Sequence, residues 1–326
     1  MVDPLSIMKA PLTAVSGFGV TMRLAVIGQA PFGEAVLKRL LDDGEEVVAV
    51  SAPATPDGGR PDPLRASAEA QGLPVFGTRD FKSDDVFDAY MDLKPDLNVM
   101  AFVTDILAER VLFAPPKETI QYHPSLLPKH RGASAMNWAI IQGETKTGLT
   151  IFWPDKGIDT GPILLQREVK IEPDDTLGSL YFGKLFEMGV EAIAESVRLI
   201  NTGKASRIPQ DHARATYEGL CRDKESVIDW SKSAQHVYDL VRGCNPQPGA
   251  HTTFRGERLK IFDCSLGKVT EGAPGQVVSL SAEQIVVALR GGSLLVRRVQ
   301  PNGSTKLKVA DFVSMSTIEP GEFFGR

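Results

Sequence analysis

The sequence has 326 residues, of which 42% are hydrophobic and 24% charged, as in an ordinary globular protein with room for two domains. With 36 Lys and Arg against 41 Asp and Glu, the formal charge of −5 gives no general attraction for nucleic acid or an anionic membrane, although a local basic patch stays open. Three cysteines without paired spacing, and no apolar run of about 20 residues, argue against a zinc site, a disulfide framework and a membrane span. We therefore expect a cytoplasmic protein without a bound metal.

The chain begins with a mildly apolar stretch, residues 1–22, that has one Lys, an interrupted hydrophobic region and no convincing cleavage site. These features are not those of a secretory signal. Because Met22 stands directly before the first strong strand, residues 1–22 are predicted to be a disordered extension or an artefact.

Residues 23–205 are predicted to form one α/β domain, because short β-branched runs alternate with segments of helical period. Consecutive strands joined by helices indicate a Rossmann-like, mostly parallel sheet buried on both faces. Asp174 and Asp175 are expected to cap the longest helix. The expected strands are 24–27, 46–51, 74–76, 96–102, 119–122, 147–153 and 161–171, and the expected helices are 34–44, 64–72, 83–93, 106–112, 134–142 and 176–201.

The carboxyl-terminal part has a different sequence pattern. Residues 206–225 belong to a polar stretch without a clear period and are predicted to be a linker. Residues 226–326 carry one helix, 233–242, and several short strands separated by glycine-bearing turns, which favours a small OB-like β-barrel. This part has 12 Lys and Arg against 9 Asp and Glu, a net charge of +3 that is too small to assign a nucleic-acid face. The expected strands are 251–254, 259–264, 275–280, 284–289, 293–299 and 306–309.

The first strand is followed by GQAPFG, residues 28–33, which resembles the dinucleotide-binding pattern with Ala30 at its middle glycine. That position needs Gly so that the backbone can approach a pyrophosphate, and an acidic residue is expected at the end of the second strand. The second strand ends at Ser51 without a carboxylate. A tight turn between strand and helix is therefore favoured over a nicotinamide-nucleotide site.

The stretch QYHPSLLPKHRGASAMNW, residues 121–138, follows an apolar strand and carries the first chemistry-capable loop. His123 precedes Pro124, which marks a chain leaving the sheet. Ser125 offers a hydroxyl, and small residues at 132–134 allow close approach of a ligand to the backbone. Lys129, His130 and Arg131 are expected on the rim of the loop. Taken alone, the stretch also fits a turn with a solvated charge run.

A second polar loop, residues 153–161, follows the next strand and has the same character. It places Asp159 between Gly157 and Gly161. If the two strands end at the same edge of the sheet, Asp159 can meet His123. An imidazole beside a carboxylate is the minimal equipment for proton transfer near neutral pH, because the carboxylate orients the ring and favours its charged form.

Together, HPSLLPKHRGASAMNWAI and GLTIFWPDKGIDTGPILLQ resemble the formyltransferase superfamily that uses 10-formyltetrahydrofolate, and the similarity extends from about residue 23 to 323. The segments AVIGQAPFGEAVL, YHPSLLPKHRGASAMNW and ATYEG are most similar to the amino-terminal hydrolase domains of 10-formyltetrahydrofolate dehydrogenases. The resemblance implies that residues 23–205 are the catalytic domain, and that folate is the small-molecule partner.

The resemblance also implies roles for individual residues. His123, Asp159 and Gln121 would be catalytic, with Asp159 as general base and with His123 and Gln121 stabilising the developing oxyanion. Formyltransferases acting on amines carry Asn where this chain has Gln121, which makes amine transfer less expected. The implied folate-binding residues are Met100, Ala101, Phe102, Val103, Thr104, Ser125, Leu126, Leu127, Pro128, Asp155 and Gly157.

Three classes of function follow. The preferred one passes the formyl group of 10-formyltetrahydrofolate to water or a small acceptor. The second is methionyl-tRNA formyltransferase, or beside it a sugar-nucleotide N-formyltransferase; a tRNA partner ranks second because residues 57–65 do not form a strongly basic insertion. The third is a non-catalytic folate- or nucleic-acid-binding module, against which the presence of both His123 and Asp159 argues.

Overall fold

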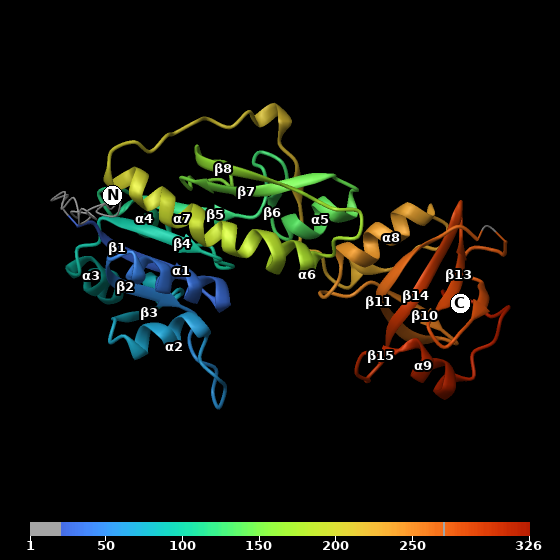
Figure 1. Ribbon diagram of the computed structural model, residues 1–326. Coiled ribbons are helices and arrows are strands. Elements are labelled where there is room, and N and C mark those ends of the chain that lie inside the picture. The colour runs from blue at the N-terminus through green and yellow to red at the C-terminus, as the bar shows by residue number, and fades with distance from the viewer. Residues whose placement is uncertain (1–20, 270) are drawn as a thin grey trace, which may run out of the picture.

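The computed structural model describes residues 21–269 and 271–326, which form a sheet domain and a small barrel lying beside it (Figure 1). The prediction for residues 1–22 falls outside the described residues except at its last two positions, where Met22 is buried in the core. No helix within the described ranges is long and apolar enough to cross a membrane.

The first domain is built on a seven-stranded sheet in the order β3-β2-β1-β4-β5-β7-β8. The first five strands along the chain pair in parallel, whereas β7 is antiparallel to both β5 and β8. The mostly parallel α/β class predicted from the sequence is therefore confirmed. The strands are β1 (Arg23–Gly28), β2 (Glu46–Ala52), β3 (Val75–Gly77), β4 (Leu97–Ala101), β5 (Thr119–His123), β7 (Lys146–Phe152) and β8 (Ile163–Lys170).

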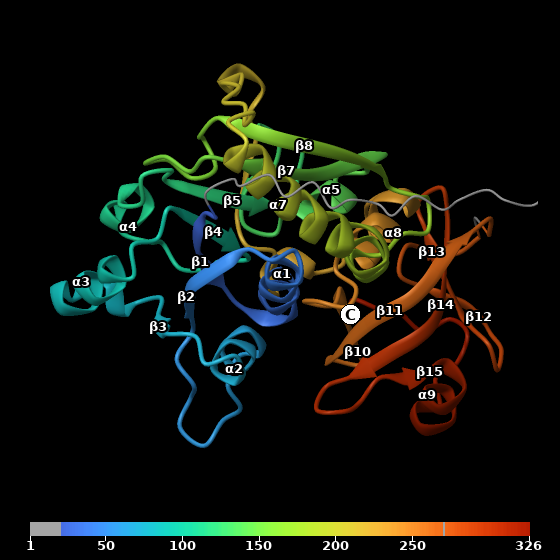
Figure 2. The same cartoon turned by 60° about the vertical axis from the view of Figure 1, so that its left-hand side comes forward.

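Helices cover both faces of this sheet because the strand residues alternate between two cores. Leu24 and Val26 of β1 pack with α1 (Ala30–Asp42), α2 (Pro63–Ala70) and α7 (Phe186–Asn201). Ala25 and Ile27 point to the other face, where α3 (Asp84–Asp92) and α4 (Glu109–Phe113) pack. Figure 2 shows α1 and α7 lying side by side over the sheet.

The long helix predicted over 176–201 is interrupted. It consists of α6 (Leu177–Leu180), a π-helical turn (Tyr181–Leu185) and α7. Thr176, rather than Asp174 or Asp175, is its N-cap, because the Thr176 and Ser179 side chains form a reciprocal capping box. Asp175 instead accepts hydrogen bonds from the Glu172 backbone and the Ser179 hydroxyl.

The first glycine loop owes its composition to packing. A Cβ at Gly28 would lie 2.2 Å from the Ala101 carbonyl oxygen, and one at Gly33 would lie 3.0 Å from Leu64. Helix α1 begins at Ala30, four residues earlier than predicted. The loop is a tight turn between β1 and α1.

The second domain is an antiparallel sheet in the order β10-β11-β14-β13-β12, with β15 paired to β14. Its outer strands are joined through the carboxyl terminus, because Phe324 bridges to Phe254 and Phe323 bridges to Gln276. This closure gives the predicted small barrel. Its elements are α8 (Ala234–Gly243), β10 (His251–Phe254), β11 (Glu257–Gly267), β12 (Val277–Leu280), β13 (Ile285–Leu289), β14 (Gly292–Pro301), β15 (Leu307–Lys308) and α9 (Val309–Ser316), of which α9 was not predicted.

The predicted linker does not hang free between the domains. After α7 the chain crosses back along the sheet domain, as Figure 1 shows, and descends beside β6 before α8 begins. Ile208 bridges to Ile163, and β9 (Tyr217–Glu218) pairs in parallel with β6 (Arg131–Gly132). We call residues 203–221 the strap.

Candidate functional site

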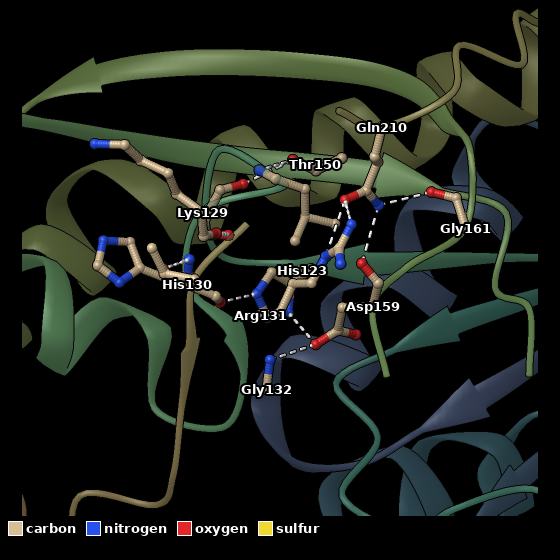
Figure 3. A network of polar contacts seen from close by, with 12 residues as sticks. His123, Lys129, His130, Arg131, Gly132, Thr150, Asp159, Gly161 and Gln210 are labelled. Atoms are coloured by element: carbon tan, nitrogen blue, oxygen red, sulfur yellow. Dashed lines mark hydrogen bonds and ion pairs between the residues drawn. The ribbon is translucent and has the colours of Figure 1, made fainter. Parts of the chain in front are cut away.

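The two polar loops meet, but not in the way predicted from the sequence. Because β7 runs antiparallel to β5, with Gln121 opposite Phe152 and His123 opposite Thr150, the loops leave their strands at opposite ends. The loop after β7 folds back, and Asp159 reaches His123 (Figure 3). Helix α5 (Ala135–Ile141) follows the first loop.

His123 is 5% exposed, and each of its ring nitrogens faces an oxygen atom. Nε2 lies 2.8 Å from the His130 backbone carbonyl, and Nδ1 lies 3.5 Å from Asp159 Oδ2. The carbonyl can only accept, so Nε2 carries a proton. The contact at Nδ1 is long for a hydrogen bond, which leaves that nitrogen able to turn toward a bound ligand.

The Asp159 carboxylate is 9% exposed and held from one side. Its Oδ2 accepts a 2.7 Å hydrogen bond from the Gly132 backbone N–H in addition to facing His123. Its Oδ1 has no hydrogen-bond partner among the described residues and is not fully buried. The second carboxylate oxygen is thus available to accept a hydrogen bond from a water molecule or another donor.

Close packing fixes the Asp159 loop. Asp159 itself adopts the left-handed conformation at φ 54°, which is uncommon for residues other than glycine. A Cβ at Gly161 would lie 1.8 Å from the Trp153 carbonyl oxygen, so the loop requires Gly at that position. The Asp155 carboxylate turns inward, accepting hydrogen bonds from Gly157 N–H and the Thr160 hydroxyl. Asp155 and Gly157 therefore shape the loop.

The predicted folate-loop residues divide into buried and accessible ones. Ser125 is fully buried, and its hydroxyl donates to the Lys129 carbonyl at 2.7 Å. Leu127 is also buried and is tied to the Thr150 hydroxyl and the Gln166 amide. Leu126 and Pro128 are half-buried. Ser125 and Leu127 thus hold the loop together from within.

The predicted folate-binding residues at the end of β4, residues 100–104, pass from the core to the surface. Met100 and Ala101 are buried at the end of β4, and Val103 is half-buried. Phe102 is 44% exposed in the left-handed conformation, at φ 59°, and Thr104 contacts Gln29. The backbone strain at Phe102 presents its ring at the strand end.

Gln121 is half-buried on β5, two residues before His123. No hydrogen bond to its side-chain amide occurs within residues 21–269 and 271–326. The neighbouring Tyr122 is buried rather than half-buried. Burial raises the pKa of its hydroxyl, which therefore stays protonated. The Gln121 amide remains available to a ligand.

The expectation of a basic rim holds only for Lys129, whose side chain is 49% exposed and pairs with Glu144. His130 is 4% exposed and faces Glu218 at 3.3 Å, and Arg131 is 1% exposed. The prediction failed because the charge of a side chain does not show whether it points into solvent or into the protein. Here the strap buries both side chains. Sequence reasoning also missed the strap residue Gln210, although the matching segment ATYEG nearby marked that region.

A separate cavity of about 640 Å³ is lined by the end of α5 and the loop after it, by residues 171–174 and by α8. Its lining includes Glu144, Asp174, Tyr238 and Arg242, but neither His123 nor Asp159. Within the described residues, no group of three or more His, Cys, Asp or Glu side chains is arranged to hold a metal ion.

Comparison with known proteins supplies the context for this geometry. Residues 22–196 match the family described as formyl transferase, and residues 221–316 match formyl transferase, C-terminal domain. Human mitochondrial 10-formyltetrahydrofolate dehydrogenase is 40% identical over 263 residues, which are 78% of this chain but only 28% of that protein. This chain thus spans less than a third of the dehydrogenase's length.

Methionyl-tRNA formyltransferase from Geotalea uraniireducens is 38% identical over 310 residues, covering 94% of this chain and 98% of that protein. Among solved structures, HypX from Aquifex aeolicus in complex with tetrahydrofolic acid superimposes with a TM-score of 0.67 at 20% identity, covering 94% of this chain and 51% of that one. That likeness supports the fold class.

Proposed function

The chain belongs to the formyl transferase family, and we propose that it transfers the formyl group of 10-formyltetrahydrofolate to water, giving formate and tetrahydrofolate. Enzymes of this family take the group from formyl-tetrahydrofolate, and this chain carries both of their domains. The open question is the acceptor. His123, Asp159 and Gln121 are the residues that we assign to the reaction.

The Asp159 contacts support its role as general base. Oδ2 is held by Gly132 N–H and faces His123, so Oδ1 is left to take a proton from water. The water oxygen forms a bond to the formyl carbon, and negative charge develops on the formyl oxygen. The N10–carbon bond then breaks, N10 receives the proton that Asp159 took from water, and formic acid leaves and ionises to formate.

We assign stabilisation of the charge on the formyl oxygen to His123 and Gln121. His123 donates from Nε2 to the His130 carbonyl, so only Nδ1 can be shared with a ligand, and Nδ1 donates to the formyl oxygen when the ring is an imidazolium. The second donor is the Gln121 amide, which no described residue engages. Donors directed at a developing oxyanion typically contribute ~10²–10³-fold to kcat.

We prefer water as the acceptor because Gln121 stands where formyltransferases acting on amines carry Asn. An Asn at this position would hold its amide one methylene closer to the backbone, so an amine acceptor and the formyl oxygen would meet a different geometry. Changing Gln121 to Leu keeps the bulk of the side chain and removes the amide. We expect Gln121→Leu to lower formate release ~100-fold. Loss of less than about threefold would contradict the assignment.

Transfer to methionyl-tRNA is the second candidate, because the Geotalea methionyl-tRNA formyltransferase matches this chain along 98% of its own length. One experiment separates the two. Purified protein is incubated with 10-formyltetrahydrofolate alone, with charged initiator tRNA, and with an amino sugar nucleotide. Formate released without an acceptor supports hydrolysis. Formyl-methionyl-tRNA without formate would refute hydrolysis and establish the second candidate, and a formylated sugar would refute both.

A further inference from the structure

We propose that Gln210, a strap residue, is a positioning residue that holds Asp159 in its reactive orientation. The inference deepens the proposed function and rests on the role assigned there to Asp159. Gln210 lies between the two domains in the chain, yet its side chain is 6% exposed and reaches the Asp159 loop (Figure 3).

The Gln210 amide uses both its donor and its acceptor groups. Its Nε2 donates to the backbone carbonyls of Asp159, at 2.9 Å, and Gly161, at 2.7 Å. Its Oε1 accepts from Arg131 Nη2 at 2.7 Å and from Nε at 3.2 Å. A flipped amide would place N–H groups against the guanidinium and oxygen against two carbonyls. The contacts therefore fix one orientation of the amide.

Arg131 makes that orientation obligatory. It is 1% exposed, and its guanidinium also donates to the Tyr217 hydroxyl, at 2.6 Å, and to His212 Nδ1, at 3.0 Å. In the described residues no carboxylate lies within ion-pair distance of it. A buried cation with only neutral acceptors needs each of them, so the Gln210 oxygen is held toward Arg131 and its NH₂ group toward the Asp159 loop.

Asp159 needs this restraint because of its backbone. At φ 54° it occupies a conformation that costs free energy for a residue with a side chain and persists only where its surroundings enforce it. The turn directs the Asp159 carbonyl at Gln210 and the carboxylate at Gly132 N–H and His123. If the carbonyl is released, the turn can relax, and the carboxylate then moves away from His123.

Two substitutions separate positioning from mere stability. Gln210→Met keeps the bulk but leaves Arg131 with one acceptor fewer, so we expect a lower Tm as well as a lower kcat. Gln210→Glu keeps an acceptor for Arg131 but, as a carboxylate, has no N–H for the two carbonyls. At pH 7.5 an ion pair with Arg131 partly offsets the two lost hydrogen bonds, so we expect Gln210→Glu to melt above Gln210→Met, to lower kcat at least ~tenfold and to leave KM for 10-formyltetrahydrofolate within about twofold.

The control is Gln300→Glu, which removes an amide donor to the Ser304 carbonyl in the barrel. We expect it to retain wild-type kcat. A Gln210→Glu enzyme with wild-type kcat would overturn the proposal. So would one whose KM rises and whose Tm falls in proportion to its loss of kcat, because that pattern indicates general loosening.

A measurement without turnover distinguishes this proposal from the proposed function. Amide hydrogen–deuterium exchange is followed for the peptide covering residues 155–162 and for a barrel peptide covering 277–289. Gln210→Glu should speed exchange in the first peptide and not in the second. If the wild-type enzyme forms no formate, the hydrolase assignment fails, and exchange alone decides on positioning. Unchanged exchange at 155–162 would overturn the positioning role.

Discussion

Replacing Asp159 by Asn tests the assignment on which the mechanism most depends. The substitution is nearly isosteric, and Asn tolerates the left-handed conformation that Asp159 adopts at φ 54°. An amide oxygen can still accept the 2.7 Å hydrogen bond from Gly132 N–H. The change removes the negative charge facing His123 and the ability to accept a proton from water.

The expected magnitude follows from these two losses. A general base contributes ~10²–10⁴-fold to a rate. We expect kcat for formate release to fall ~10³-fold, which corresponds to about 4 kcal/mol of activation free energy. Folding should be affected much less, because the Gly132 contact persists and a single hydrogen bond is worth about 1 kcal/mol net. A small change in Tm is therefore expected together with a large loss of turnover.

The assay measures formate and tetrahydrofolate released from 10-formyltetrahydrofolate by wild-type protein, Asp159→Asn and a matched control. Asp229→Asn is that control, because Asp229 lies before α8, away from His123, where its carboxylate accepts hydrogen bonds from Ser231 and lies 3.9 Å from Lys232 Nζ. Turnover by Asp159→Asn above one tenth of wild type, with unchanged products, would refute the base assignment. Equal losses in Asp229→Asn would show that the effect is not specific to the site.

Two further predictions concern the barrel. Phe324 is 2% exposed and packs its ring against Trp230 and Phe254. Phe324→Ala should therefore lower the free energy of unfolding, measured by urea titration, by ~3–5 kcal/mol. A loss below about 1 kcal/mol would contradict closure of the barrel by residues 323–324. Burial and neighbouring cations lower the pKa of His251 below 6.5, so its contribution to stability is present above pH 6.5 and is lost as the pH falls through the lowered value. His251→Asn should therefore show a smaller drop in Tm between pH 7.5 and about 5 than wild type, and equal drops would exclude this residue.

The sequence predicted the sheet domain well because its signals are local. Leu24 to Ile27 are β-branched or apolar throughout, as expected for a strand buried on both faces, and the structure places them in β1 with cores on either side. Glycines and prolines mark where such runs stop. His123 and Asp159 do lie together as expected, but the expected reason was wrong, because their strands are antiparallel and the loop after β7 folds back to reach His123.

What could not be predicted depends on contacts between distant residues. The antiparallel direction of β7 has no local signature, because the strand residues read the same in either direction. Arg131 lies two residues after the exposed Lys129, and it is buried where it meets Gln210, 79 positions away. The π-helical turn after Leu180 likewise interrupts a segment whose apolar period continues through it.

The strap accounts for the failed prediction at Arg131. It begins after the segment that matches the amino-terminal formyl transferase domain, which ends at residue 196, and most of it lies before the carboxyl-terminal match, which begins at residue 221. It nevertheless pairs with Arg131 and Gly132, and Gly132 donates to Asp159. A polar stretch without a period lacks the pattern of a helix or strand, but its polar groups must be satisfied wherever it is buried. Here polar groups of the strap are satisfied by the loops that carry Arg131 and Asp159, so the segment that joins the domains also packs against the candidate site.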